Sequence, residues 1–296
     1  NLAAAADNIL PLVRDGAHTA VMAAVRAHAG DIEVARAACG ALQNLSIAAD
    51  NKAPLVRDGA HTAVMAAARA HTSDVEVARA ACWVLQSLAC AADNAVPLVR
   101  AGAHTAVMAA ARAHAGDVEV ARAACGALRK LALATDNLVP LKRDGAHTAV
   151  MAVARAHAGD AEVARHACWV MQCLACAADN RVPLVRDGAH TAVMAAALAH
   201  ASDVEVVRAA CSALRELAVA ADNSVPLFHD GAHTAVMAAA RAHAGDVKVA
   251  RHACTALWGL SVAADNRVPL VRDGAHTAVM AAARAHAGDV EVARAG

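Results

Sequence analysis

The chain has 296 residues, and its 27 Lys and Arg residues balance its 27 Asp and Glu residues. This balance argues against a nucleic-acid binder or an anionic-membrane binder, because such proteins are normally basic. Aromatic residues make up only 1% of the chain, so the core must be built from Ala, Val, Leu and Met. No uncharged apolar run approaches the roughly 20 residues that a membrane-spanning helix needs.

One block, Gly-Ala-His-Thr-Ala-Val-Met-Ala, recurs with a strict 43-residue period. Its glycines are Gly16, Gly59, Gly102, Gly145, Gly188, Gly231 and Gly274. A unit of this size cannot bury its own apolar face, so the copies must stack as a solenoid. We expect a single domain over residues 1–296. Its repeats are 7–49, 50–92, 93–135, 136–178, 179–221 and 222–264, with a partial repeat at 265–296.

The sequence of each unit predicts three helices, as residues 50–92 illustrate. Asp50 or Asn51 can cap a short first helix, which Gly59 ends with a positive φ angle. The second helix is rich in Ala, a strong helix former, and its Val and Met face the core. Asp74 then caps a longer third helix. The apolar positions of the third helix recur at steps of three and four: Val75, Ala78, Cys82, Leu85 and Leu88.

Two segments resemble armadillo repeats: the stretch Ala-Cys-Trp-Val-Leu-Gln-Ser-Leu-Ala at 81–89, and the Gly-Ala between the first two helices. The resemblance covers the whole chain, and the period suits that class. It implies an all-α, right-handed superhelix of three-helix repeats. HEAT repeats are the alternative, since Asp-x-x-Val-x-Arg also suits them, but a HEAT unit has two helices. In armadillo proteins the third helices line a concave groove for extended peptides, so the resemblance implies a non-enzymatic protein-binding scaffold.

The resemblance also implies a Trp followed four residues later by an Asn along that groove, and this chain largely lacks the pair. The Trp slot holds Gly40, Trp83, Gly126, Trp169, Ser212 and Thr255. The Asn slot holds Asn44, Ser87, Lys130, Cys173, Glu216 and Gly259. The third helix also varies most between copies, which indicates either a face tuned for a ligand or a solvated face free to drift. The ligand-contacting residues that we predict in these slots are Asn44, Trp83, Lys130, Trp169 and Glu216.

An Arg precedes the Trp slot by four residues in every copy. These residues are Arg36, Arg79, Arg122, Arg165, Arg208, Arg251 and Arg294. Stacked repeats would line up their guanidinium groups at intervals of about 10 Å. Guanidinium groups bind carboxylates and phosphates, which predicts an acidic or phosphorylated extended ligand. The alternative is a solvated, salt-bridged face, because a Glu lies three residues before each Arg except where Lys248 stands.

Histidine and cysteine point to no cofactor and no metal. The periodic His residues stand ten apart within a unit, across a whole helix, which is too far for shared coordination. Six Cys occupy one inward-facing slot, and helices about 8–10 Å apart are too distant for disulfides between equivalent slots. Cys173 and Cys176 have the spacing of a metal or redox half-site but no second pair. We expect a reduced, cytoplasmic protein with no enzymatic activity.

The two ends lack polar capping repeats. Residues 1–6 resemble the tail of a third helix, and residues 289–296 resemble the front of one. We expect both end faces to expose apolar side chains and to favour head-to-tail self-association. Two origins fit the sequence, a fragment of a longer array and an engineered array. The functional alternative is accordingly a designed or recently duplicated array with no evolved ligand.

Overall fold

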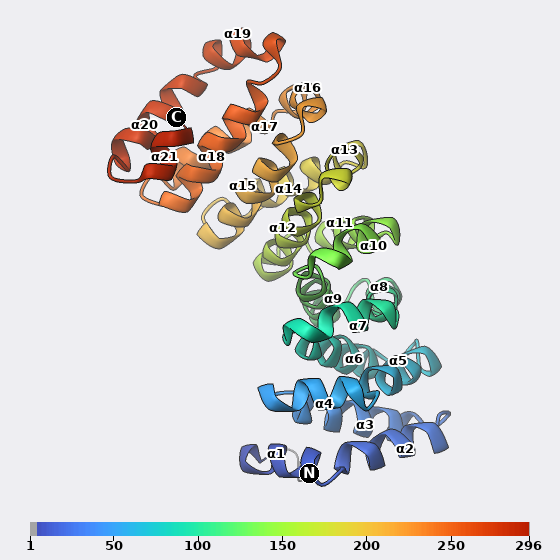
Figure 1. The fold of residues 1–296 in the computed structure, drawn as a ribbon. Helices are drawn as coiled ribbons and strands as arrows, with labels where there is room; N and C mark the ends of the chain where they lie inside the picture. Colours follow the sequence, from blue (N-terminus) through green and yellow to red (C-terminus); the bar gives the residue numbers. More distant parts are fainter. Residues whose placement is uncertain (1–4, 296) are drawn as a thin grey trace. The chain divides into compact units, whose positions relative to one another are not determined.

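The computed structural model describes residues 5–295, and within that range the chain forms helices joined by short turns, with no strand (Figure 1). The chain divides into two compact units between Ala149 and Val150. Each unit consists of stacked three-helix repeats, which confirms the predicted all-α solenoid. The expectation of one continuous domain stays a prediction. The predicted end faces fall partly on residues 1–4 and 296, outside the described residues.

Each repeat follows the predicted order of a short first helix, a second helix and a longer third helix. The first helices are α1 (Ile9–Arg14), α4 (Lys52–Arg57), α7 (Ala95–Arg100), α10 (Leu138–Arg143), α13 (Ala178–Arg186), α16 (Ser224–His229) and α19 (Ala264–Arg272). The second helices are α2 (Ala17–Ala27), α5 (Ala60–Ala70), α8 (Ala103–Ala113), α11 (Ala146–Ala156), α14 (Ala189–Ala199), α17 (Ala232–Ala242) and α20 (Ala275–Ala285). The third helices are α3 (Ile32–Leu45), α6 (Val75–Leu88), α9 (Val118–Leu131), α12 (Ala161–Cys176), α15 (Val204–Ala218), α18 (Val247–Leu260) and α21 (Val290–Ala295).

Short 3-10 turns lead into most of the first helices. They span Ala6–Asn8, Ala49–Asn51, Ala92–Asn94, Thr135–Asn137 and Ala221–Asn223. In α13 and α19 the equivalent residues already belong to the α-helix.

A glycine in the left-handed conformation separates the first helix of each repeat from the second. Gly59 has a φ angle of 90°, and its carbonyl accepts a hydrogen bond of 2.6 Å from the Thr62 hydroxyl. The equivalent glycine has a positive φ in all seven copies. Only glycine adopts this conformation without a steric penalty, so the prediction that Gly59 ends the first helix is confirmed.

The prediction that Asn51 caps the first helix is wrong, because its side chain makes no capping bond. Its buried Nδ2 instead donates to the carbonyl oxygens of Leu45, at 2.9 Å, and Ile9, at 3.0 Å. Leu45 ends α3, where backbone carbonyls have no donor within the helix. The asparagine therefore ties the end of one third helix to the first helix of the same repeat. Asn94, Asn137, Asn223 and Asn266 make the same pair of bonds.

Histidines tie the second helix of one repeat to the end of the first helix of the next repeat. His18 Nε2 lies 2.9 Å from an oxygen of Asp58, and His104 lies at the same distance from Asp144. Ala101 replaces the aspartate at the next site, so His61 has no carboxylate there, and burial lowers its pKa. His18 and His104 thus have a structural role between repeats.

The cysteine slot of the third helix packs in the core. Burial raises the pKa of five of these thiols to about 12: Cys39, Cys82, Cys125, Cys168 and Cys211. They remain protonated at neutral pH and pack as small hydrophobic side chains. All nine cysteines are free thiols, and Cys90 and Cys176 are exposed.

Within the described residues no single helix is long and apolar enough to cross a membrane. The helix pair Val75–Leu88 and Ala92–Arg100 reaches the required length and composition together, but it is bent by 116°.

Replacing Gly59 with Ala is expected to lower the free energy of unfolding by about 1–2 kcal/mol, because an L-residue is strained at this φ. A Cβ there would also lie 3.2 Å from the Thr62 hydroxyl oxygen. Gly116→Ala is the matched control, since Gly116 has no positive φ and its Cβ would meet nothing within 4 Å. Urea unfolding followed by circular dichroism measures both, and an equal loss in the two variants would contradict the prediction.

Candidate functional site: the third-helix face

We define the third-helix face as the solvent-facing side of the third helices, which carries the Arg, Trp and Asn slots and the slot before the Asn slot. Each third helix begins at an aspartate that caps it. Asp74 Oδ1 accepts from the backbone N–H of Val77 at 2.9 Å, as predicted, and Asp117 does the same for Val120. A side-chain acceptor at this position satisfies backbone donors that have no partner within the helix.

The arginines of the predicted stripe bind these same capping aspartates, one repeat further along the chain. Arg79 Nε lies 3.1 Å from Asp117 Oδ1, and its Nη2 lies 2.5 Å from Oδ2. The same pairing joins Arg36 to Asp74, Arg208 to Asp246 and Arg251 to Asp289. These four arginines are therefore held in salt bridges between repeats, and their guanidinium groups stay partly exposed.

The glutamates three residues before the arginines form a second set of pairs. Arg Nη1 binds this glutamate in four third helices: Arg36 with Glu33, Arg122 with Glu119, Arg208 with Glu205 and Arg294 with Glu291. Arg36 and Arg208 thus each bind two carboxylates, the glutamate of their own helix and the capping aspartate of the next repeat. Arg165 is different, because none of its atoms forms a hydrogen bond or salt bridge with the described part of the chain, and its Nε is buried.

The paired arginines hold the pKa of the aspartates below its ordinary value. The pKa of Asp117 falls to about 2, chiefly because Arg79 donates hydrogen bonds to its carboxylate. The pKa values of Asp246 and Asp289 fall to about 2 for the same reason, through Arg208 and Arg251. The carboxylates stay charged throughout the physiological pH range.

The structure places the predicted Trp and Asn positions at different depths. Trp83 is 38% exposed, whereas Trp169 is half-buried. Asn44 and Lys130 are half-buried. Glu216 is bound by Arg215 and lies 3.8 Å from Arg181, so its charge is already compensated. Trp258 is more exposed than either of these tryptophans, at 61%. It stands one residue before the Asn slot and was not among the predicted contacts.

Several residues that vary in these slots are set by packing between repeats. A Cβ on Gly126 would lie 2.7 Å from the side-chain amide of Gln86. A Cβ on Gly259 would lie 2.6 Å from the carbonyl oxygen of Ala218. Ser87 is buried, and its hydroxyl donates to the Ser46 carbonyl at 2.7 Å. Helix contacts therefore account for Gly259 and Ser87, whereas the flexible end of the Gln86 side chain can move aside for a Cβ on Gly126.

An exposed apolar residue at the end of the third helix of each complete repeat is a feature that the sequence reasoning missed. We call this set the apolar column; its members are Ile47, Cys90 and Leu133 in the first unit, and Cys176, Val219 and Val262 in the second. Leu133 is 60% exposed. The signal was present as an apolar residue at every 43rd position, just after the polar residues of the third helix.

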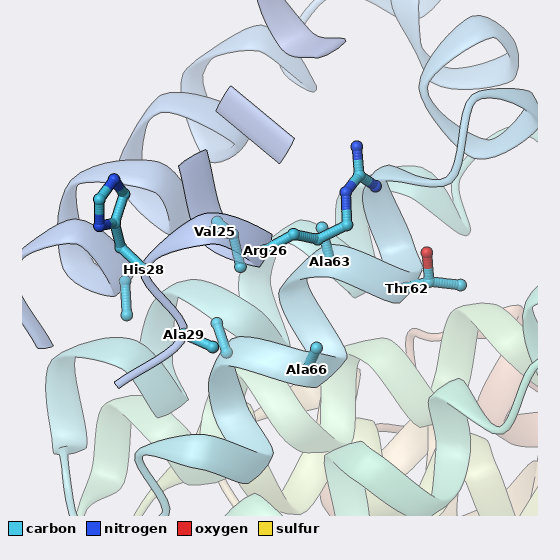
Figure 2. Close-up of a pocket in the computed structure, with 9 residues that line it drawn as sticks. Val25, Arg26, His28, Ala29, Thr62, Ala63 and Ala66 are labelled. Atoms are coloured by element: carbon cyan, nitrogen blue, oxygen red, sulfur yellow. The ribbon is translucent and has the colours of Figure 1, made fainter. Parts of the chain in front are cut away.

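Grooves also open between neighbouring second helices, because alanines fill little space. Figure 2 shows one of about 330 Å³ between α2 and α5, with Arg26 at its edge. Another, of about 630 Å³, lies between α14 and α17. There Leu198, 80% exposed, stands where the other repeats carry Arg. These grooves are lined mainly by alanine and offer few polar atoms.

Among residues 5–295, no group of three or more His, Cys, Asp or Glu side chains is placed to hold a metal ion. Cys173 is buried and Cys176 is exposed on the same helix.

Acid is expected to weaken the protein through Asp117. Its folded pKa of about 2 lies below the ordinary value of 3.8, so its contribution is complete above about pH 4 and is lost as the pH falls toward 2. Asp117→Asn keeps a capping side chain but removes the charge. We expect this variant to lose roughly 0.5–1 kcal/mol at pH 7, because solvent weakens the half-exposed pair with Arg79.

We also expect Asp117→Asn to lose less stability than the parent between pH 4 and 2. Urea unfolding across this range measures the difference. Asp93→Asn is the control, since Asp93 is exposed and caps no third helix. Identical acid sensitivity in the parent and in Asp117→Asn would contradict the assigned salt bridge.

The sequence matches the family described as the LRRK2 ARM repeat over residues 60–182 and 150–296. No curated protein matches the sequence.

Solved structures match in fold. One is an engineered protein, Northeast Structural Genomics Consortium target OR329, with 19% identity, a TM-score of 0.70, and coverage of 83% of this chain and 97% of that one. A second comes from a structure of a conserved phosphorylation switch controlling the interaction between cadherin and β-catenin. It has 15% identity, a TM-score of 0.57, and coverage of 94% of this chain and 62% of that one. Together with the three-helix repeats, the sequence match shows that this chain belongs to the armadillo-repeat family of the LRRK2 type.

Proposed function

We propose that the protein is a non-enzymatic scaffold that binds an extended segment of a partner protein along the third-helix face. The observation that carries this proposal is the exposed apolar surface on that face. Trp83, Trp258 and the apolar column leave apolar side chains in water on the third helices and at their ends. Exposed apolar surface of this kind is typical of protein-binding sites.

The spacing of the third helices suits an extended ligand. Packed helices lie about 8–10 Å apart, and an extended chain rises about 3.3 Å per residue. Roughly every third ligand residue would therefore meet a new repeat. Apolar ligand side chains would contact the apolar column, and polar backbone groups would face Asn44 and the half-buried polar residues beside it.

An acidic or phosphorylated ligand is the finer form of this proposal. The paired arginines retain partly exposed guanidinium groups, and Arg165 has no carboxylate partner to displace. A ligand phosphate would share Arg36, Arg79, Arg122, Arg208 and Arg251 with the carboxylates already bound to them. Because those carboxylates stay ionised, we expect each paired arginine to contribute less than Arg165 does.

The test is a screen of the purified protein against arrayed acidic, phosphorylated, neutral and basic peptides, each with alternating apolar residues. For the peptide that binds best, Leu133→Ala should weaken binding about tenfold, because it removes an exposed apolar contact. Leu198→Ala is the control, since it removes an exposed leucine from a second helix, 80% exposed against 60% for Leu133. Fluorescence anisotropy measures both affinities.

Equal effects of Leu133→Ala and Leu198→Ala would contradict the assignment of the third-helix face. If no peptide class binds, the alternative gains support, namely a designed or duplicated array with no evolved ligand. A rise of the apparent mass with concentration, measured by light scattering, would then be the expected behaviour of that alternative.

A further inference from the structure

Repeat 6 departs from the others at the front of its third helix. Lys248 stands in α18 where Glu33, Glu76, Glu119, Glu162, Glu205 and Glu291 stand in the other copies. The front of α18 therefore carries two cations, Lys248 and Arg251, and one carboxylate, Asp246, where the front of each other third helix carries one cation and two carboxylates. The exchange reverses the sign of the local charge on the third-helix face.

The exchange also leaves one guanidinium nitrogen without its usual partner. In α3, α9, α15 and α21 the Nη1 atom of the arginine binds the glutamate three residues earlier. Arg251 keeps its salt bridge to Asp289 through Nε and Nη2, but its Nη1 meets no acceptor in the described part of the chain. Lys248 is exposed and forms no salt bridge there either.

A histidine next to this gap lacks a partner as well. His252 follows Lys248 by four residues and is half-buried, with no hydrogen bond to any described residue. The comparison with repeat 4 explains why, since His166 there lies 3.5 Å from Glu162, which occupies the position of Lys248. Arg215 of the neighbouring helix α15 also faces His252, and its Nε is buried without an acceptor.

We propose that Lys248, Arg251 and His252 form a binding site for one anionic group, a phosphate ester or a carboxylate, on the segment that occupies the third-helix face. The ligand's oxygens take the place of the glutamate that repeat 6 lacks. Lys248 supplies charge, and Arg251 Nη1 and the His252 ring supply directional hydrogen bonds. This inference rests on the proposed function and assigns a ligand chemistry to one repeat.

The electrostatics of His252 fit this role. Burial, followed by the charges of Arg215 and Arg251, lowers the pKa of His252 to about 4. Lys248 lowers it further and Asp246 opposes the shift. The ring is therefore neutral at pH 7 in the free protein, and an anion beside it would raise its pKa. The bound anion thus has a spectroscopic signature apart from its affinity.

The chain supplies its own variants for the test. Lys248→Glu gives repeat 6 the residue of the other repeats and provides an internal carboxylate for Arg251 Nη1. His252→Ala gives it the residue found at Ala37, Ala80, Ala123 and Ala209. Both variants should fold, because the other repeats carry these residues. Lys52→Glu makes the same charge change on α4 and is the matched control.

The probes are inorganic phosphate and the peptide Ala-Val-Xaa-Val-Ala, with phosphoserine, aspartate or serine at the central position. NMR titration of the His252 ring reports its pKa. Phosphate and the phosphoserine peptide should raise this pKa in the parent and in Lys52→Glu. They should leave it unchanged in Lys248→Glu, with peptide binding weakened about tenfold or more there. A response of phosphate and phosphopeptide but not of the aspartate peptide would identify the anion as a phosphate.

An equal rise in the parent and in Lys248→Glu, or no rise with any probe, would overturn the anion site. The two proposals fail separately. Loss of binding in Leu133→Ala with no effect of Lys248→Glu keeps the scaffold and removes the anion site. Loss of binding in Lys248→Glu with no effect of Leu133→Ala keeps the anion site and contradicts ligand binding by the apolar column. As a positive design, Glu205→Lys combined with Ala209→His should create a second anion site in repeat 5, on α15.

Discussion

The capping aspartate of the third helix is the group on which the repeat arrangement most depends. One carboxylate satisfies the backbone at the start of its own helix and receives the arginine of the preceding repeat, as Asp117 does for Val120 and Arg79. The local fold and the stacking of repeats thus share one side chain. A half-exposed ion pair alone contributes little. Here the partner is held in place by the helix start, and the same bond recurs along each unit.

The features that the sequence predicted correctly are local ones. The turn at Gly59 and the cap at Asp74 follow from residues within three or four positions of each other, which a period-based reading captures. The partners of Asn51 and Arg79 lie about 40 residues away in the sequence. Rules based on local propensity therefore do not predict these contacts. The signal was indirect: arginine and aspartate are both invariant at a fixed offset, although only the glutamate within the helix had been considered as the arginine's partner.

The candidate site was only partly predictable, because some side chains on the third-helix face pack against neighbouring helices and others are exposed to solvent. Variation between the third helices had left two alternatives, a face tuned for a ligand and a solvated face free to drift, yet contacts with neighbouring helices account for Gly259 and Ser87. What remains for a ligand is the exposed tryptophans, the apolar column and the few arginine nitrogens that no carboxylate occupies. The exposure of a side chain on this face depends on how closely two neighbouring helices approach. The sequence of a single repeat does not specify that distance.

The fixed offsets of the bonds between repeats bear on how such an array changes its length. The arginine, histidine and asparagine links join slots 38, 40 and 42 residues apart, always from one copy to the next. Excising or duplicating any window of 43 residues therefore rejoins equivalent slots and recreates every link, wherever the cut falls. An indel of any other size misaligns all three at once. Recombination between near-identical copies is thus structurally neutral in whole repeats, and it reorders the third helices, where the copies differ.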